Sequence, residues 1–185
     1  MTTSLPLSPI QNTDWPTEIA DMLEGFAGQL NIYRVMAHHP GLLQAWADLR
    51  DHVVNGTALG AERSEIVILR TGHLLGSAYE WAHHVVRGRQ AGLSDARIAK
   101  LAGSVGDMQP EDALFAQAVD QLFEHKALTP RVQQDLTALV GNAGMLDLIA
   151  TVGFYSTLGY ILNSFDPPLD EAVAQDLAKA PLLER

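Results

Sequence analysis

The chain has 185 residues, of which 47% are hydrophobic, and its 22 acidic and 12 basic residues give a formal net charge of -10. This length and apolar content suffice for the core of one domain. The negative charge disfavours binding to nucleic acid or to an anionic membrane surface. The absence of cysteine excludes a thiolate nucleophile, a disulfide redox pair and a cysteine-ligated metal centre.

The first 16 residues differ from the rest of the chain. Pro6, Pro9 and Pro16 interrupt any helix in this segment. The segment also lacks the basic and apolar regions of a secretory signal. We therefore expect an extended N-terminal arm over residues 1–16, a single domain over residues 17–185 and a cytoplasmic location.

Beyond the arm, apolar residues recur at helical spacing and are separated by clusters of turn-forming residues. Gly92 and Ser94 are typical of the end of one helix and the N-cap of the next. The pattern predicts an all-α, compact multi-helix bundle. We expect helices over about 17–30, 41–54, 61–75, 77–91, 94–102, 110–125, 130–140, 142–163 and 169–179.

The segment Glu65 to Leu69, "EIVIL", has three consecutive β-branched residues, which is typical of a strand. The apolar pattern continues through "RTGHLL" without a turn, and no neighbouring segment has the pattern of a partner strand. A helix of about four turns explains more residues, so we predict a helix here.

The segment Leu148 to Phe165 carries no charge over eighteen residues, which is the lower limit for a membrane span. Acidic residues close both ends, no basic residue flanks it, and several polar side chains interrupt it. We therefore predict a buried core helix rather than a span. Gly153, Ser156 and Gly159 form a face on which another helix or subunit can approach closely.

A polar stripe lies on the predicted helix 77–91. Ser77, Glu80 and His84 share one helical face, and a carboxylate four residues before a histidine can orient the imidazole and raise its pKa. Glu65 lies one helix earlier and can fold back towards this stripe. Such a pair also occurs as an ordinary surface contact, so spacing alone leaves both interpretations open.

At these residues the sequence resembles a known family. The runs "ERSEIVILR" and "GSAYEWAHHVVRGRQAGLSDARIAKL" are similar to the carboxymuconolactone decarboxylase and alkylhydroperoxidase-D-like superfamily. Its peroxidases carry Cys-x-x-Cys-x-x-x-His with a glutamate twelve residues before the first cysteine. Those positions fall on Ser77, Glu80, His84 and Glu65. The resemblance implies an all-helical fold, with the motif helix lining a pocket near a subunit boundary of a homo-oligomer, which we expect to be a dimer, trimer or hexamer.

The departures from the motif narrow the function that the resemblance implies. Without cysteine, a thiol peroxidase cycle is chemically excluded. The decarboxylase branch of the superfamily also lacks the cysteines and keeps the glutamate and the histidine. That branch usually carries a basic residue where this chain has Ala82, so recognition of a substrate carboxylate requires another cation, for which the candidates are Arg70, Arg63 and Arg34.

We therefore predict a decarboxylase or related lyase that acts on a small carboxylated lactone or related ring compound. His84 is the expected general acid or base, Glu80 its orienting partner and Glu65 a second carboxylate. The expected substrate contacts are Ser77, Tyr79, Trp81, His73 and Arg70.

We expect no cofactor and no metal, although His73, His84 and Glu80 are residue types that could bind one. We also expect a small-molecule substrate and no nucleic-acid or membrane partner. The alternative is a binding or assembly protein that keeps the fold and has lost catalysis. The substrate, the direction of the reaction and the exact oligomer are not determined by the sequence.

Overall fold

A computed structural model describes residues 7–182. Within this range the structure is built from helices and turns and contains no strand, which confirms the all-α prediction. The α-helices are α1 (Phe26–Gln29), α2 (Asn31–Met36), α3 (Pro40–Asp51), α4 (Ala61–Leu74), α5 (Ala78–Gln90), α6 (Asp95–Leu101), α7 (Pro110–His125), α8 (Pro130–Phe165) and α9 (Glu171–Lys179).

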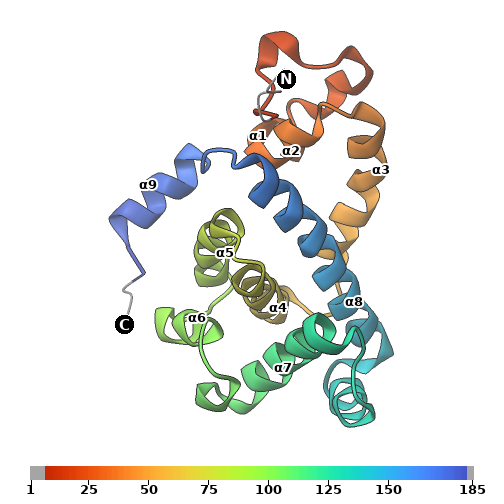
Figure 1. The fold of residues 1–185 in the computed structure, drawn as a ribbon, viewed down its shortest axis with the longest axis vertical. Coiled ribbons are helices and arrows are strands. Elements are labelled where there is room, and N and C mark those ends of the chain that lie inside the picture. Colours follow the sequence, from red (N-terminus) through yellow and green to blue (C-terminus); the bar gives the residue numbers. More distant parts are fainter. Residues whose placement is uncertain (1–6, 183–185) are drawn as a thin grey trace, which may run out of the picture.

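Helices α4 and α5 pack against each other in the middle of the molecule, and α7 and α8 pack on α4 (Figure 1). The segment Glu65 to Leu69 lies inside α4, so the prediction of a helix rather than a strand is confirmed. Its apolar residues are buried. The β-branched run is tolerated because tertiary packing outweighs the weak intrinsic preference for a strand.

The core consists of two hydrophobic clusters that meet at α4 and α8. Ile66 and Leu69 belong to a cluster with residues of α5, α6, α7 and of α8 as far as Val152. Ile68 belongs to a second cluster with residues of α2, α3 and the second half of α8. Helix α4 thus holds the two halves of the core together, and the motif helix α5 packs along it.

Helix α8 consists of two segments, because Gly141 has a φ of 70° and a ψ of 178°. This break lies between the predicted helices 130–140 and 142–163. Glycine adopts this conformation readily, whereas an L side chain opposes it.

The second segment of α8 has one buried face and one exposed face. An eighteen-residue window within Pro130–Phe165 has a mean hydropathy of 1.4, and 28% of that window is buried within the chain. One face packs on α4, whereas Leu146, Ile149 and Tyr160 are exposed. By length and composition α8 could cross a membrane, so the absence of a membrane partner and the cytoplasmic location stay predictions.

The predicted helix 17–30 is wrong. Residues Thr17–Met22 form a 3-10 helix, α1 is a separate short turn, and α2 follows it as an element that the sequence did not indicate. Extended backbone at Gly25 and Leu30 separates these pieces. A Cβ at Gly28 would lie 1.8 Å from the carbonyl oxygen of Leu23, so glycine is required for this tight reversal.

The described part of the predicted N-terminal arm lies against the body of the protein. Asn12–Asp14 form a 3-10 turn, and Trp15 is buried in the second hydrophobic cluster. The Trp15 indole N–H donates to the carbonyl oxygen of Ile19 at 2.8 Å. Residues 1–6 of the arm lie outside the described part of the chain.

Candidate functional site

A short reversal after α4 positions the motif helix. Gly76 has a φ of 62°, and Ser77 is the N-cap of α5, where its Oγ accepts a hydrogen bond from the backbone N–H of Glu80 at 3.4 Å. A Cβ at Gly72 would lie 3.3 Å from the Cβ of Glu80. The absence of a side chain at Gly72 therefore lets α4 and α5 approach closely, with Glu65 opposite His84.

The three predicted catalytic side chains converge in the core. Nδ1 of His84 lies 2.6 Å from Oε2 of Glu65, and Nε2 lies 3.4 Å from Oε2 of Glu80. The side chain of His84 is only 4% exposed, and those of Glu65 and Glu80 are 13% and 5% exposed. The imidazole is thus placed between two carboxylates, away from water.

This environment shifts the pKa of His84. Burial by itself would lower the pKa, but Glu65 and then Glu80 stabilise the imidazolium and raise its pKa to about 9. His84 is therefore protonated at neutral pH. An imidazolium between two carboxylates is a group that can exchange a proton.

Two tyrosines that the sequence analysis did not identify lie at the same site. The ring of Tyr155 on α8 meets the His84 imidazole edge to face, with 5.0 Å between centroids and 89° between planes. Burial, followed by the charge of Glu80, raises the pKa of Tyr155 well above its ordinary value and that of Tyr33 on α2 to about 12. Tyr155 lies within the uncharged run of α8, which offered no motif to mark it.

A cavity of about 1060 Å³ opens beside this cluster, at the junction of α4, α5 and α6. Ser77, Trp81 and His73 are among the residues that line it, and their contact with a substrate stays a prediction. Glu65, Glu80 and His84 are not among its lining residues. The cavity therefore reaches the N-cap of the motif helix, and the buried imidazole lies beyond its wall.

Tyr79, by contrast, takes part in a separate buried contact rather than in the cavity wall. Its ring stacks on His83 at 4.0 Å between centroids, and its hydroxyl donates to Asp170. Nε2 of His83 lies 2.8 Å from the same carboxylate, which also accepts the backbone N–H of Asn31 at 3.0 Å. This contact, which we call the Asp170 clamp, attaches the chain after α8 to α5 and α2, and the predicted substrate contact of Tyr79 is not supported.

The three arginines considered for recognition of a substrate carboxylate form ion pairs or hydrogen bonds with other groups of the protein. Arg70 is buried, forms a bidentate pair with Asp120 and donates to the carbonyl oxygens of Leu101 and Gly103. This placement speaks against the substrate contact predicted for Arg70. Arg63 pairs with Glu111. Arg34 donates to three groups in the N-terminal region.

The alternative of a metal site is not supported by the arrangement of side chains. Within residues 7–182 no group of three or more His, Asp or Glu side chains is arranged to hold a metal ion.

His73 lies on the cavity wall, where burial and then the charge of Arg70 lower the pKa of its imidazole. His73 is thus neutral at pH 7.

Comparison with known proteins places the motif helix within a recognised family. The model of the carboxymuconolactone decarboxylase family matches residues 40–120, which include α3 to α6, most of α7 and the convergent Glu65, Glu80 and His84. The resemblance to the carboxymuconolactone decarboxylase family is thus confirmed over these residues. The comparison with curated proteins finds no match.

Two solved structures share the fold of this chain. One is the debrominase Bmp8, in a cysteine-to-alanine variant with 2,3,4-tribromopyrrole, at a TM-score of 0.72 and 12% identity over 96% of this chain and 98% of the other. The second is an uncharacterised peroxidase-related protein from Ralstonia eutropha JMP134, described as an alkylhydroperoxidase AhpD core. Its TM-score is 0.71 at 14% identity, over 92% of this chain and 96% of the other.

Proposed function

We propose that the protein is a decarboxylase or related lyase that acts on a small carboxylated lactone or similar ring compound. The observation that carries the proposal is the buried His84, held between Glu65 and Glu80 at 2.6 and 3.4 Å. A titratable group with a strongly shifted pKa beside a cavity is a candidate for proton transfer. The small ring bound by the structural neighbour Bmp8 supports a compact ring compound as the ligand.

The reaction uses the imidazolium as an acid. The bond between the ring carbon and the carboxylate breaks, CO2 leaves, and the electron pair stays on the ring carbon as an enolate. One proton is then added to that carbon. Glu80 lies one turn from the cavity-lining Ser77 and 3.4 Å from His84, so we propose that it transfers the proton. Glu65 holds the imidazole in place, and water restores the proton.

The test is CO2 release from 4-carboxymuconolactone by the wild type, by His84→Ala and by Glu80→Gln, with the exposed His125→Ala as a matched control. Release that is lost in the two site variants and kept in the control supports the proposal. Absence of release by the folded wild type counts against this substrate. Equal release by all variants would overturn the proposed proton transfer.

A second candidate is a catalytically silent binding or assembly protein with the same fold. The observation that favours it is that His84 is almost completely buried and does not line the cavity. In that case the buried pair serves stability alone. His84→Ala would then lower the free energy of unfolding without changing the affinity of any ligand that binds in the cavity.

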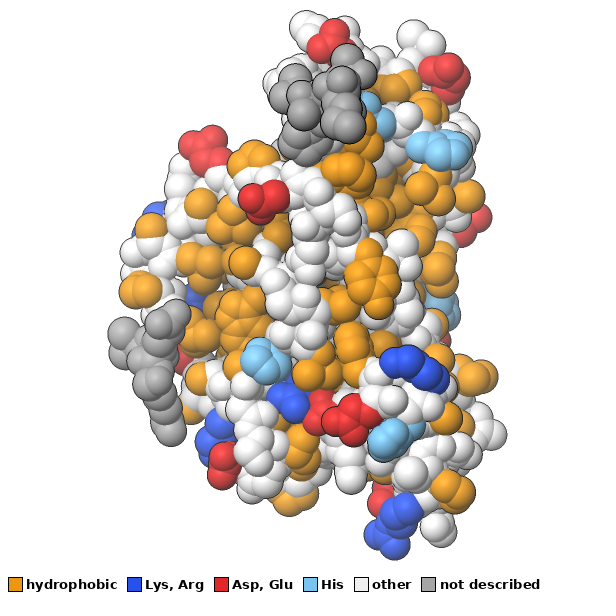
Figure 2. Space-filling model, in the orientation of Figure 1, with side chains coloured by type: hydrophobic (Ala, Val, Ile, Leu, Met, Phe, Trp, Pro, Cys, Tyr) orange, Lys and Arg blue, Asp and Glu red, His pale blue; other side chains and the backbone are white. Residues whose placement is uncertain are grey.

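We also propose that the protein assembles with copies of itself across α8. Leu146, Ile149 and Tyr160 are exposed at helical spacing on one face, and Gly153 lies between them. Apolar side chains gather over α8 and α3 on the face shown in Figure 2. A contiguous apolar surface of this kind is typical of an interface. We propose that a second copy of the chain covers this apolar face, because the same face on each copy can pair around a twofold axis.

A further inference from the structure

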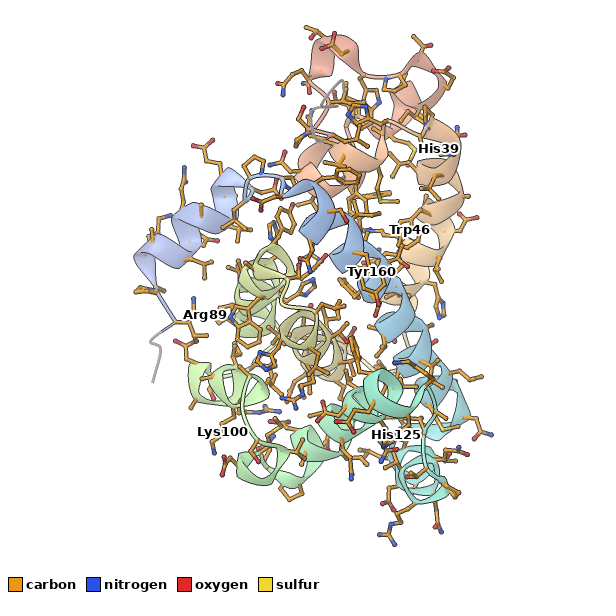
Figure 3. All side chains as sticks on the ribbon, viewed as in Figure 1. His39, Trp46, Arg89, Lys100, His125 and Tyr160 are labelled. Carbon is orange, nitrogen blue, oxygen red and sulfur yellow. The ribbon has the colours of Figure 1, made fainter. Side chains whose placement is uncertain are left out.

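Two charged side chains that line the cavity form no ion pair with other described residues of the protein. Lys100 on α6, which is labelled in Figure 3, and Asp107 in the following 3-10 turn both line the cavity. Neither forms an ion pair among residues 7–182. Most other basic side chains of the described chain are engaged by a carboxylate or a carbonyl oxygen. Lys100 is thus a cation that remains available to a ligand.

The shape of the cavity suits a flat ligand. The indole of Trp81 provides an aromatic wall, and several of the other lining residues are glycine or alanine. His73 meets Trp81 in an edge contact at 6.2 Å between centroids. A planar ring can therefore lie against the indole, where aromatic contact adds to the apolar burial.

The polar groups determine which substituents such a ring can carry. His73 is neutral at pH 7, so Lys100 supplies the positive charge for a carboxylate. Asp107 accepts hydrogen bonds, and it repels a second carboxylate nearby. The cavity therefore favours a ligand with one carboxylate and one hydrogen-bond donor.

From these contacts we infer that the cavity binds a planar ring with a carboxylate recognised by Lys100 and a hydroxyl or N–H group that donates to Asp107. This inference rests on the proposed function, because the recognised carboxylate is the group that leaves as CO2. It assigns to Lys100 the carboxylate recognition for which this chain lacks a basic residue at Ala82. Lys100 and Asp107 then determine specificity, whereas His84 and Glu80 handle the proton.

The test is calorimetric titration with three probes, 4-hydroxybenzoate, its methyl ester and terephthalate. We expect the wild type to bind 4-hydroxybenzoate about tenfold or more tightly than either of the others, the equivalent of about 1.4 kcal/mol. Lys100→Gln should remove the preference for the acid over the ester. Asp107→Asn should remove the discrimination against terephthalate.

Matched controls are Lys179→Gln and Asp176→Asn, which change the same residue types on the exposed face of α9. Melting curves confirm that each variant is folded. Equal binding of acid and ester by the wild type, equal effects of Lys100→Gln and Lys179→Gln, or no binding of any probe would overturn the inference.

This experiment separates the inference from the proposed reaction. Lys100-dependent binding by a protein that releases no CO2 from 4-carboxymuconolactone supports the ligand site and counts against that compound as the substrate. Conversely, CO2 release that depends on His84 and is unchanged in Lys100→Gln supports the lyase and overturns the role of Lys100.

Discussion

Nδ1 of His84 lies 2.6 Å from Oε2 of Glu65, although the two residues are 19 positions apart in the chain. The reversal at Gly76 and the close approach of α4 and α5 at Gly72 create this contact. Because both side chains are largely buried, the contact controls the protonation of the imidazole. Several measurable properties of the protein depend on it.

The titration of His84 can be followed by NMR of its imidazole signals. The wild type should show a pKa of about 9. Glu65→Gln should lower this pKa, because the amide no longer stabilises the imidazolium. The signal of the exposed His125 should be the same in both proteins. An unchanged midpoint for His84 would contradict the importance of Glu65.

The same pair predicts how stability depends on pH. The folded pKa of about 9 exceeds the ordinary value near 6.5, so the stabilisation is complete below about pH 6.5 and is lost as the pH rises through 9. Urea unfolding should show that Glu65→Gln costs on the order of 3 kcal/mol at pH 6 and far less at pH 9.5. Glu111→Gln removes an exposed pair with Arg63 and should cost less than about 1 kcal/mol. A cost for Glu65→Gln that does not change with pH would refute the prediction.

The Asp170 clamp should control the order of the C-terminal helix. Asp170→Asn weakens the interactions with His83 and Tyr79, and losing such buried contacts costs about 1–3 kcal/mol. We expect faster hydrogen exchange in α9. The control is Asp176→Asn, whose partner Lys179 is exposed. If exchange in α9 is the same in both variants, the clamp does not hold this helix.

The break in α8 depends on glycine at one position. Gly141→Ala places a side chain at a φ of 70°, and strain of this kind costs about 1–3 kcal/mol. Gly41→Ala adds a Cβ at an exposed helical position of α3, 3.7 Å from Cε1 of His39, where alanine is favoured by about 0.5–1 kcal/mol. Thermal unfolding should therefore rank Gly141→Ala below the wild type. Equal melting temperatures would show that α8 can straighten without cost.

The exposed apolar side chains of α8, Leu146, Ile149 and Tyr160, should determine the oligomeric state. Light scattering after size exclusion should show a dimer or a larger oligomer for the wild type. Tyr160→Glu and Leu146→Glu should produce a smaller species, because burying a charge in an apolar interface is unfavourable. Gln117→Glu, which adds the same charge on the exposed face of α7, is the control. A wild-type monomer would exclude the proposed assembly.

Much of the fold was predictable because its signals are local. The helical spacing and the N-caps at Ser77 and Ser94 depend on residues within one or two turns, and they placed most helices close to their observed bounds. The segment 17–30 was not predictable, because its reversal depends on the contact of Gly28 with the backbone of Leu23. Spacing within one helix likewise could not reveal Tyr155 beside His84.

By itself, the sequence determined the helical class, the exclusion of thiol chemistry and the four motif positions that bring Glu65, Glu80 and His84 to one site. The helical class follows from periodicity and the exclusion of thiol chemistry from composition, whereas the four motif positions are what the resemblance to the superfamily implies. Only the tertiary structure determined that His84 is buried and protonated, that Arg70 is bound to Asp120 and that Lys100 lines the cavity. Burial and ion pairing depend on residues far apart in the chain, and these contacts exist only once the helices have packed.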